Sequence, residues 1–277
     1  TNPCVEIGMF PQIDGESGWQ GCNLTEINGG LCVDEESFYK ACEAGAILGT
    51  LQAGYTDFTY LPDTTKAIFD REALLGVSIT GWMNNPDILF DGKILEKGAE
   101  IVKETNKRVA ELLCTCVKPS GNASVLLGTA SGIHAEHSEQ YIRNIQLNKD
   151  SEVAQLIAKT NPNMVEDSVW SANGTDFVVS FPITPKQGSI LKDKLIGTDH
   201  LDLVAKAQKH WVNTGKNPEL CADPTVSHNV SNTILVEDWD DVAEYVYSNR
   251  DNFAGISFLS TSGDKDFNQA PNTEVLD

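Results

Sequence analysis

An amide, a thiol and a carboxylate stand at alternate positions near the start of the sequence, at Asn2, Cys4 and Glu6. In an extended strand, side chains two residues apart share one face, so these groups would form a row with about 6.6 Å between neighbours. Pro3 and Val5 would face the other way and pack. Such a row could present a thiol and a general base to one small substrate. Taken alone, the pattern more often describes a buried cysteine between two solvated polar residues.

Two further segments contain residues that could take part in catalysis or binding. Residues 1–30 are interrupted by glycine and proline and predict a finger of extended segments, with Cys22 at its return end. A loop of small residues comes later, at the start of a predicted helix: Pro119, Ser120, Gly121, Asn122, Ala123 and Ser124. Backbone N–H groups at a helix start bind anions, and glycine lets the backbone approach closely. A bare Pro-Ser-Gly would be better explained as an ordinary turn between helices.

Alternating helices and strands must position these groups. Asp34 can cap a helix that runs to about Gly54, with an apolar stripe of Phe38, Ala41, Ala44, Leu48 and Leu51. Other helices are expected at 64–74, 92–114, 151–159, 200–214 and 240–249, of which 92–114 is the longest. Strands are expected at 75–82, 141–147, 175–182, 229–236 and 254–260. This alternation predicts an α/β fold with parallel pairing.

The composition argues against several classes of protein. The chain has 20 Lys and Arg against 40 Asp and Glu, a net charge of −20, which disfavours direct nucleic-acid binding and docking to anionic membranes. No apolar run approaches the ~18 residues of a transmembrane helix. The 7 cysteines are irregularly spaced without a Cys-x-x-Cys pair, so neither a disulfide framework nor a metal site is expected. We expect a soluble, cytoplasmic protein.

The finger and the loop together resemble the catalytic subunit of ribonucleotide reductases. They are most similar to the adenosylcobalamin-dependent class II enzymes, whose finger reads N-P-C-x-E-I and whose phosphate loop reads P-S-G-T or P-S-G-N. Other family-like stretches are Cys116-Val117-Lys118, Ser131-Gly132-Ile133-His134, Gly263-Asp264-Lys265-Asp266 and Gln269-Ala270-Pro271. The resemblance covers nearly all 277 residues. It implies part of a ten-stranded α/β barrel with the finger loop threaded through its centre.

The resemblance also implies a role for each candidate residue. Cys4 matches the cysteine that becomes a thiyl radical and takes the 3′-hydrogen of the ribose, and Glu6 matches the base that accepts the 3′-hydroxyl proton. Asn2 matches the amide that orients the ribose hydroxyls. Cys22 matches one of two cysteines that reduce the 2′ position and end as a disulfide. The loop from Pro119 to Ser124 matches the substrate phosphate site, where most relatives have threonine at the position of Asn122.

The family's partners follow from the same resemblance. They are adenosylcobalamin as cofactor, a ribonucleoside di- or triphosphate as substrate, and a dithiol reductant such as thioredoxin or glutaredoxin. The product would be 2′-deoxyribonucleotides for DNA synthesis.

The extent of the resemblance leaves alternatives open. Residues 1–277 match the C-terminal portion of a single catalytic barrel domain, with 1–30 as the finger and 31–277 as barrel strands and helices. The upstream half, with the first redox cysteine that would pair with Cys22, and the reducing tail are expected to be absent from this chain. The chain is therefore expected to act with that upstream half, as a fragment, a split-gene product or an intein-processed piece. The alternative is a catalytically silent module, derived from the same barrel, that binds nucleotide phosphates or has a regulatory role.

Overall fold

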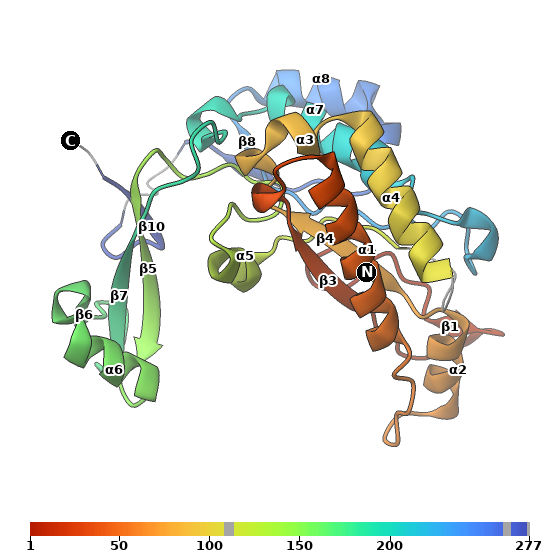
Figure 1. Cartoon of the computed structure of the whole chain (residues 1–277), viewed down its shortest axis with the longest axis horizontal. Coiled ribbons are helices and arrows are strands. Elements are labelled where there is room, and N and C mark those ends of the chain that lie inside the picture. Colours follow the sequence, from red (N-terminus) through yellow and green to blue (C-terminus); the bar gives the residue numbers. More distant parts are fainter. Residues whose placement is uncertain (108–113, 263–266, 276–277) are drawn as a thin grey trace.

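Helices and short strands alternate along the chain, as Figure 1 shows for a computed structural model that describes residues 1–107, 114–262 and 267–275. The helices are α1 (Glu35–Ala53), α2 (Asp63–Arg71), α3 (Pro86–Leu89), α4 (Gly92–Lys107), α5 (Gly121–Leu127), α6 (Glu152–Thr160), α7 (Thr198–Ala207) and α8 (Trp239–Ser248). The strands are β1 (Gln12–Ile13), β2 (Glu16–Ser17), β3 (Asn23–Asn28), β4 (Leu75–Thr80), β5 (Tyr141–Asn148), β6 (Val165–Asp167), β7 (Asp176–Ile183), β8 (Ile234–Val236), β9 (Phe258–Ser260) and β10 (Asn272–Glu274).

Parallel pairing organises the body of the molecule. β3 pairs in parallel with β4, and β8 pairs in parallel with β9. Single parallel bridges join Val77 of β4 to Thr115, and Val117 to Val230. Parallel neighbours need crossover connections, and the helices between these strands supply them. The expected α/β fold with parallel pairing is therefore confirmed for the body, while the ten-stranded barrel stays a prediction.

A second sheet lies to one side of the body, in the order β10-β5-β7-β6, and all its pairs are antiparallel (Figure 1). The sequence predicted the strands at 141–147 and 175–182 correctly. The expectation of parallel pairing is wrong for them. The chain between β5 and β7 folds back as α6 and β6 beside β7 instead of crossing over the sheet, and a strand pattern alone does not specify strand direction.

Helix α1 begins as expected but buries a different face. The Asp34 carboxylate accepts a hydrogen bond from the Ser37 N–H at 2.8 Å, and the Ser37 hydroxyl accepts one from the Asp34 N–H at 3.1 Å, which is a capping box. The predicted apolar stripe is confirmed at Phe38, which is buried, and wrong at Ala44, Leu48 and Leu51, which are exposed. Apart from Phe38, the buried face consists of small residues, Cys42, Gly45, Ala46, Gly49, Thr50 and Ala53, where α1 packs closely on β3, β4 and α4.

The long helix predicted at 92–114 corresponds to α4, which is described as far as Lys107. Residues 108–113 and the family-like stretch 263–266 lie outside the described residues. Cys114 is extended rather than helical, and its carbonyl accepts a hydrogen bond from the Val77 N–H at 2.8 Å. The segment 114–117 therefore continues the parallel sheet next to β4, and the loop 119–124 follows directly from it.

A small apolar cluster attaches the finger to the sheet. Ile7, Leu74 and Cys116 are buried in it, and Cys22 packs against them together with other partly buried side chains, Met9, Leu24, Cys221 and Val226. Residues 23–28 of the finger segment form β3, so the part outside the sheet is 1–22. The cluster thereby holds both Cys22 and the start of the finger beside the segment that leads to the loop 119–124.

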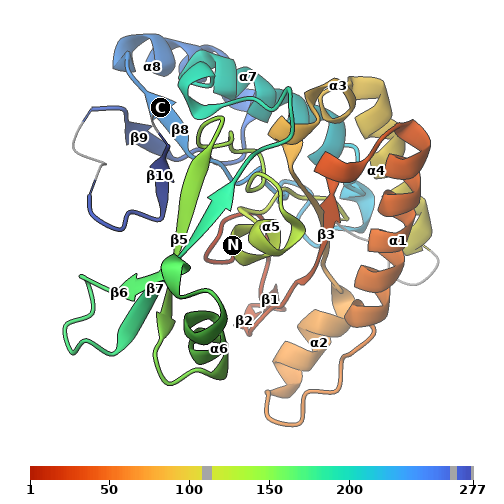
Figure 2. The same cartoon turned by 60° about the vertical axis from the view of Figure 1, so that its left-hand side comes forward.

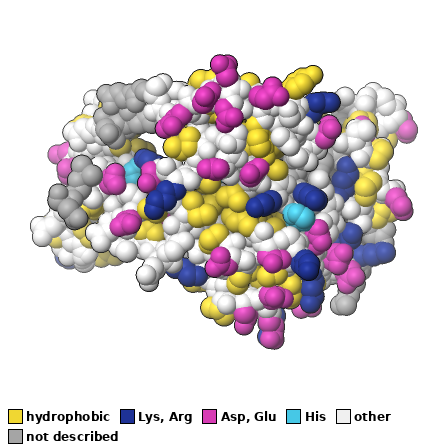
Figure 3. Space-filling view, turned by 90° about the horizontal axis from the view of Figure 1, so that it is seen from above, with side chains coloured by type: hydrophobic (Ala, Val, Ile, Leu, Met, Phe, Trp, Pro, Cys, Tyr) yellow, Lys and Arg dark blue, Asp and Glu magenta, His cyan; other side chains and the backbone are white. Residues whose placement is uncertain are grey.

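None of the described helices combines the length and the apolar character that a membrane span requires. On the face seen in Figure 3, acidic side chains are spread widely with basic ones among them, around an apolar area. This distribution agrees with the net charge of −20.

Candidate active site

The first residues of the finger form a turn rather than a strand. The Val5 N–H donates to the Asn2 carbonyl at 3.0 Å, and Val5 has a positive φ of 63°. The side-chain oxygen of Asn2 accepts a second hydrogen bond, from the Ile7 N–H at 3.1 Å. Pro3 favours this outcome, since its fixed φ suits the second position of a turn. The predicted extended row of Asn2, Cys4 and Glu6 is therefore wrong.

Residues 229–231 hold the finger from the other side; the strand predicted at 229–236 is confirmed only for 234–236, so these three residues precede β8. The Asn229 N–H donates to the Glu6 carbonyl at 3.0 Å, and the Asn229 amide donates to the Val5 carbonyl at 3.1 Å. The Ser231 hydroxyl donates to the Cys4 carbonyl at 2.7 Å. These bonds all go to the backbone of the finger, so the position of Cys4 is fixed while its side chain stays exposed.

Glu6 turns inward, toward Cys22 and Cys116. Its side chain is 1% exposed, and its Oε2 has no hydrogen-bond partner among the described residues. Burial, followed by the charges of Glu6 and of a Cys4 thiolate, raises the pKa of Cys22 to about 11. Burial also raises the pKa of Cys116 well above its ordinary value, and the charges of Glu6 and Cys22 add to it. Cys4, Glu6 and Cys22 thus lie within electrostatic reach of one another, and Cys22 is a protonated thiol near neutral pH.

The loop Pro119–Ser124 stands at a helix start, as predicted. Ser120 has a positive φ of 61°, and α5 begins at Gly121. A Cβ added at Gly121 would meet no atom within 4 Å, so this backbone borders open space. The Ser120 hydroxyl is buried without a hydrogen-bond partner among the described residues, whereas the Ser124 hydroxyl donates to the Gly121 carbonyl at 2.8 Å. Of the two loop hydroxyls, that of Ser120 is thus buried and unpartnered within the described chain, and that of Ser124 is used within α5.

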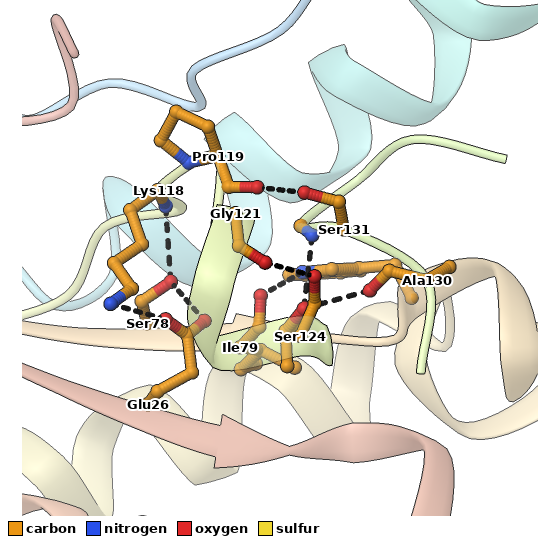
Figure 4. A network of polar contacts seen from close by, with 12 residues as sticks. Glu26, Ser78, Ile79, Lys118, Pro119, Gly121, Ser124, Ala130 and Ser131 are labelled. Atoms are coloured by element: carbon orange, nitrogen blue, oxygen red, sulfur yellow. Dashed lines mark hydrogen bonds and ion pairs between the residues drawn. The ribbon is translucent and has the colours of Figure 1, made fainter. Parts of the chain in front are cut away.

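Residue Lys118 anchors the loop to β3 and β4 through a buried polar network (Figure 4). Its Nζ lies 2.7 Å from Glu26 Oε2, and its N–H donates to the Ser78 hydroxyl at 3.0 Å. The Ser78 hydroxyl in turn donates to Glu26 Oε1 at 3.0 Å. On the other side, the Ser131 hydroxyl donates to the Pro119 carbonyl. Sequence reasoning missed Glu26 and Ser78, which become neighbours only through the parallel register of β3 and β4.

One cavity joins the finger to the loop. It has a volume of about 340 Å³, and Cys4 and Pro119 both line it, with His134 and Ser257 also in its wall. Burial lowers the pKa of His134, so its ring is neutral at pH 7. The ring accepts from the Thr233 N–H at Nε2, 3.1 Å away, which leaves Nδ1 to donate to the Ser131 carbonyl at 3.0 Å. The neutral ring thus acts as a fixed part of the wall.

Comparisons with known proteins bear on this arrangement. No family model matches the chain. It is 26% identical over 236 residues to a probable adenosylcobalamin-dependent ribonucleoside-triphosphate reductase of Dictyostelium discoideum, a match that covers 80% of the chain and 29% of that relative. It is also 26% identical over 170 residues to the adenosylcobalamin-dependent ribonucleoside-triphosphate reductase of Euglena gracilis, covering 58% of the chain and 23% of that relative. The resemblance to adenosylcobalamin-dependent ribonucleotide reductases is confirmed.

The fold agrees with this resemblance. The crystal structure of a B12-dependent class II ribonucleotide reductase superposes with a TM-score of 0.75 at 18% sequence identity, covering 99% of the chain and 40% of that enzyme. The chain therefore has the fold of a part of a class II ribonucleotide reductase. It spans less than a third of the length of the two curated relatives.

Proposed function

We propose that this chain is a catalytic part of an adenosylcobalamin-dependent ribonucleotide reductase, which converts ribonucleoside di- or triphosphates to 2′-deoxyribonucleotides for DNA synthesis. The observation that carries the proposal is the cavity of about 340 Å³ that Cys4 and Pro119 share. It sets an exposed thiol beside Pro119, the first residue of a loop that leads into the backbone N–H groups at the start of α5. A ribose at Cys4 would thus have its phosphates within reach of the loop 119–124.

The residues present fit the proposed cofactor. Cys4 is exposed and lines a cavity, so a group that approaches from outside the described chain can reach its sulfur. Adenosylcobalamin, when bound, would supply an organic radical that removes the hydrogen atom of the thiol. The backbone bonds to Asn229 and Ser231 would keep the Cys4 backbone in place during that transfer.

The remaining finger residues would act on the ribose. With its hydrogen atom gone, the Cys4 sulfur would take the 3′-hydrogen of the substrate. Glu6 would accept the 3′-hydroxyl proton, since its Oε2 is buried and has an unfilled acceptor position. The side-chain oxygen of Asn2 is held by the Ile7 N–H, which leaves the NH₂ group of Asn2 to donate to a ribose hydroxyl.

Cys22 would supply reducing equivalents. Its raised pKa of about 11 keeps the S–H bond intact at neutral pH, so the residue can deliver hydrogen to the 2′ side of the ribose. The 2′-hydroxyl would leave as water, and Cys22 with a second cysteine of the whole protein would end as a disulfide. A dithiol protein of the thioredoxin or glutaredoxin class would then reduce that disulfide.

Cys4→Ser in the whole protein tests the proposal. A serine O–H bond is too strong for the hydrogen exchange, so deoxynucleotide formation should fall to background while the nucleotide still binds. Cys221→Ser is the matched control, because serine can keep the hydrogen bond from Cys221 to the Asn217 carbonyl. Product from Cys4→Ser would exclude the thiyl role. A wild-type protein that binds nucleotide and never forms product would instead support the silent module.

A further inference from the structure

A second cavity, of about 470 Å³, lies between α5 and the β5–β7 pair. In Figure 1 and Figure 2, α5 and these two strands face each other, and Val125 of α5 lines the cavity opposite them. Tyr141 and Arg143 of β5 lie opposite Ile183 and Phe181 of β7, so the four share one face of the sheet, and all of them line the cavity. The volume lies within the ~300–1,000 Å³ typical of small-molecule sites.

The wall of this cavity contains a buried carboxylate, Glu136, which is 4% exposed. Its Oε1 accepts from the Asn84 amide at 2.7 Å, and its Oε2 accepts from the Tyr141 hydroxyl at 3.0 Å. Burial, followed by the charge of Glu136, raises the pKa of Tyr141 to about 12, so this hydroxyl stays a donor. In the described part of the chain no basic side chain forms an ion pair with Glu136, although buried carboxylates are normally paired.

A guanidinium stands on the other side of the same hydroxyl. Arg143 donates from Nη2 to the Tyr141 oxygen at 3.2 Å, and from Nε to the Asn272 side chain at 3.4 Å. Tyr141 thus separates an acceptor, Glu136, from a donor, Arg143. Each of the two retains hydrogen-bonding capacity, since a carboxylate has about four acceptor sites and a guanidinium five N–H donors.

The rest of the wall is largely apolar, with Phe181, Ile145, Pro182 and Val125 among its residues. An apolar wall of this kind suits a flat aromatic ring. Glu136 and Arg143 would determine which edge of the ring faces them. The ring must present N–H donors to a carboxylate and, beside them, acceptors to a guanidinium. Guanine has this pattern, with N1–H and the N2 amino group next to O6 and N7, and arginine pairs with O6 and N7 in other proteins.

We infer that this cavity binds a guanine base, with Glu136 accepting from N1–H and N2 and Arg143 donating to O6 or N7. Among the described residues, the wall of the cavity contains none of the loop 119–124; on this side it consists of Val125 of α5 and of Gly128 and Thr129, which follow the helix. The inference therefore does not depend on the proposed reductase function.

Equilibrium binding of free nucleosides to the purified whole protein tests this inference without any turnover. Guanosine should bind most tightly, inosine about tenfold more weakly because it lacks the N2 amino group, and adenosine more weakly still. Glu136→Gln should weaken guanosine binding at least tenfold. Glu139→Gln, an exposed carboxylate three residues away, should leave it unchanged. Equal binding of adenosine and guanosine, or unchanged guanosine binding to Glu136→Gln, would overturn the inference.

A second variant covers the case in which Glu136→Gln does not fold. Ile145→Trp should fill the cavity while keeping Glu136, Tyr141 and Arg143, and it should abolish the selective binding of guanosine. Retention of that binding by a folded Ile145→Trp protein would equally overturn the inference. The two proposals can fail separately. If these variants lose guanosine binding but the wild type forms no deoxynucleotide, the result contradicts the proposed reductase function and supports the guanine site.

Discussion

The ammonium of Lys118 and the carboxylate of Glu26 lie 2.7 Å apart, and their side chains are only 22% and 8% exposed. The pair links β3 to the residue that precedes the loop 119–124. Ser78 closes a ring of contacts with both partners. The candidate phosphate site is thus fixed to the sheet by charge as well as by the chain itself.

Glu26→Gln should therefore destabilise the protein by about 1–3 kcal/mol, because it leaves a largely buried ammonium without its counter-charge. The free energy of unfolding in urea measures this. Glu36→Gln is the control, since Glu36 pairs with Lys40 at 2.7 Å in an exposed position and should cost under about 0.5 kcal/mol. Equal effects of the two variants would show that the Glu26–Lys118 pair does not anchor the loop.

Cys22→Ser separates the two proposed thiol roles. Without Cys22, Cys4 can still take and return the 3′-hydrogen, but the 2′ position cannot be reduced normally. Tritium release from 3′-labelled nucleotide should persist while deoxynucleotide formation is lost. Cys4→Ser should lose both activities. If Cys22→Ser also loses the exchange, its assignment as a reductant is incorrect.

Stability should fall in mild acid because of His200. Burial, followed by the charge of His134, lowers the pKa of His200 to about 4, while its Nε2 lies 3.1 Å from the Ile133 carbonyl. Between pH 6.5 and about 4 the unfolded chain binds a proton that the native His200 does not, so stability decreases as the pH falls.

The contribution of His200 is about 3 kcal/mol, fully present above pH 6.5 and lost by about pH 4. His200→Gln can keep a donor for the Ile133 carbonyl and should flatten this pH dependence. Urea unfolding at pH 4.5 and pH 7 compares the two proteins. If the free energy of unfolding changes equally with pH in the wild type and in His200→Gln, His200 is not the source of the pH dependence.

The close packing of α1 on β4 gives a further prediction. A Cβ at Gly49 would clash with the Cδ1 atom of Leu75. Gly49→Ala should therefore destabilise the protein by about 1–3 kcal/mol. Gly54→Ala is the control, since the nearest atoms to its Cβ are at ordinary contact distance, 3.4 Å or more. Thermal unfolding of both variants measures the difference, and a neutral Gly49→Ala would contradict this packing.

The sequence predicted local signals well and long-range geometry poorly. The cap at Asp34, the strand expected at 75–82 and the loop at the start of α5 all depend on neighbouring residues; the cap and the loop are confirmed, and the strand is observed at 75–80. The apolar stripe of α1 held at Phe38 and failed at Leu48 and Leu51, because close packing there selected glycine and alanine over leucine. The row at Asn2, Cys4 and Glu6 failed because Pro3 favours a turn that period-two alternation does not reveal.

Polar partners far apart in sequence could not be predicted either. Glu26 and Ser78 are 52 positions apart, and only the β3–β4 register brings them together. The same holds for Glu136 and Asn84, whose contact also spans 52 positions. A single sequence contains no signal for such pairs until the strand order is known.

The turn at Asn2–Val5 has a consequence for how far atoms would have to travel. The backbone of Cys4 is held by the turn and by Ser231, while its side chain remains exposed and rotates about a single Cα–Cβ bond. Under the proposed function, that one rotation would carry the sulfur between radical donor and ribose. The hydrogen atom would then be handed over by a side-chain swing, and the finger itself would not need to move.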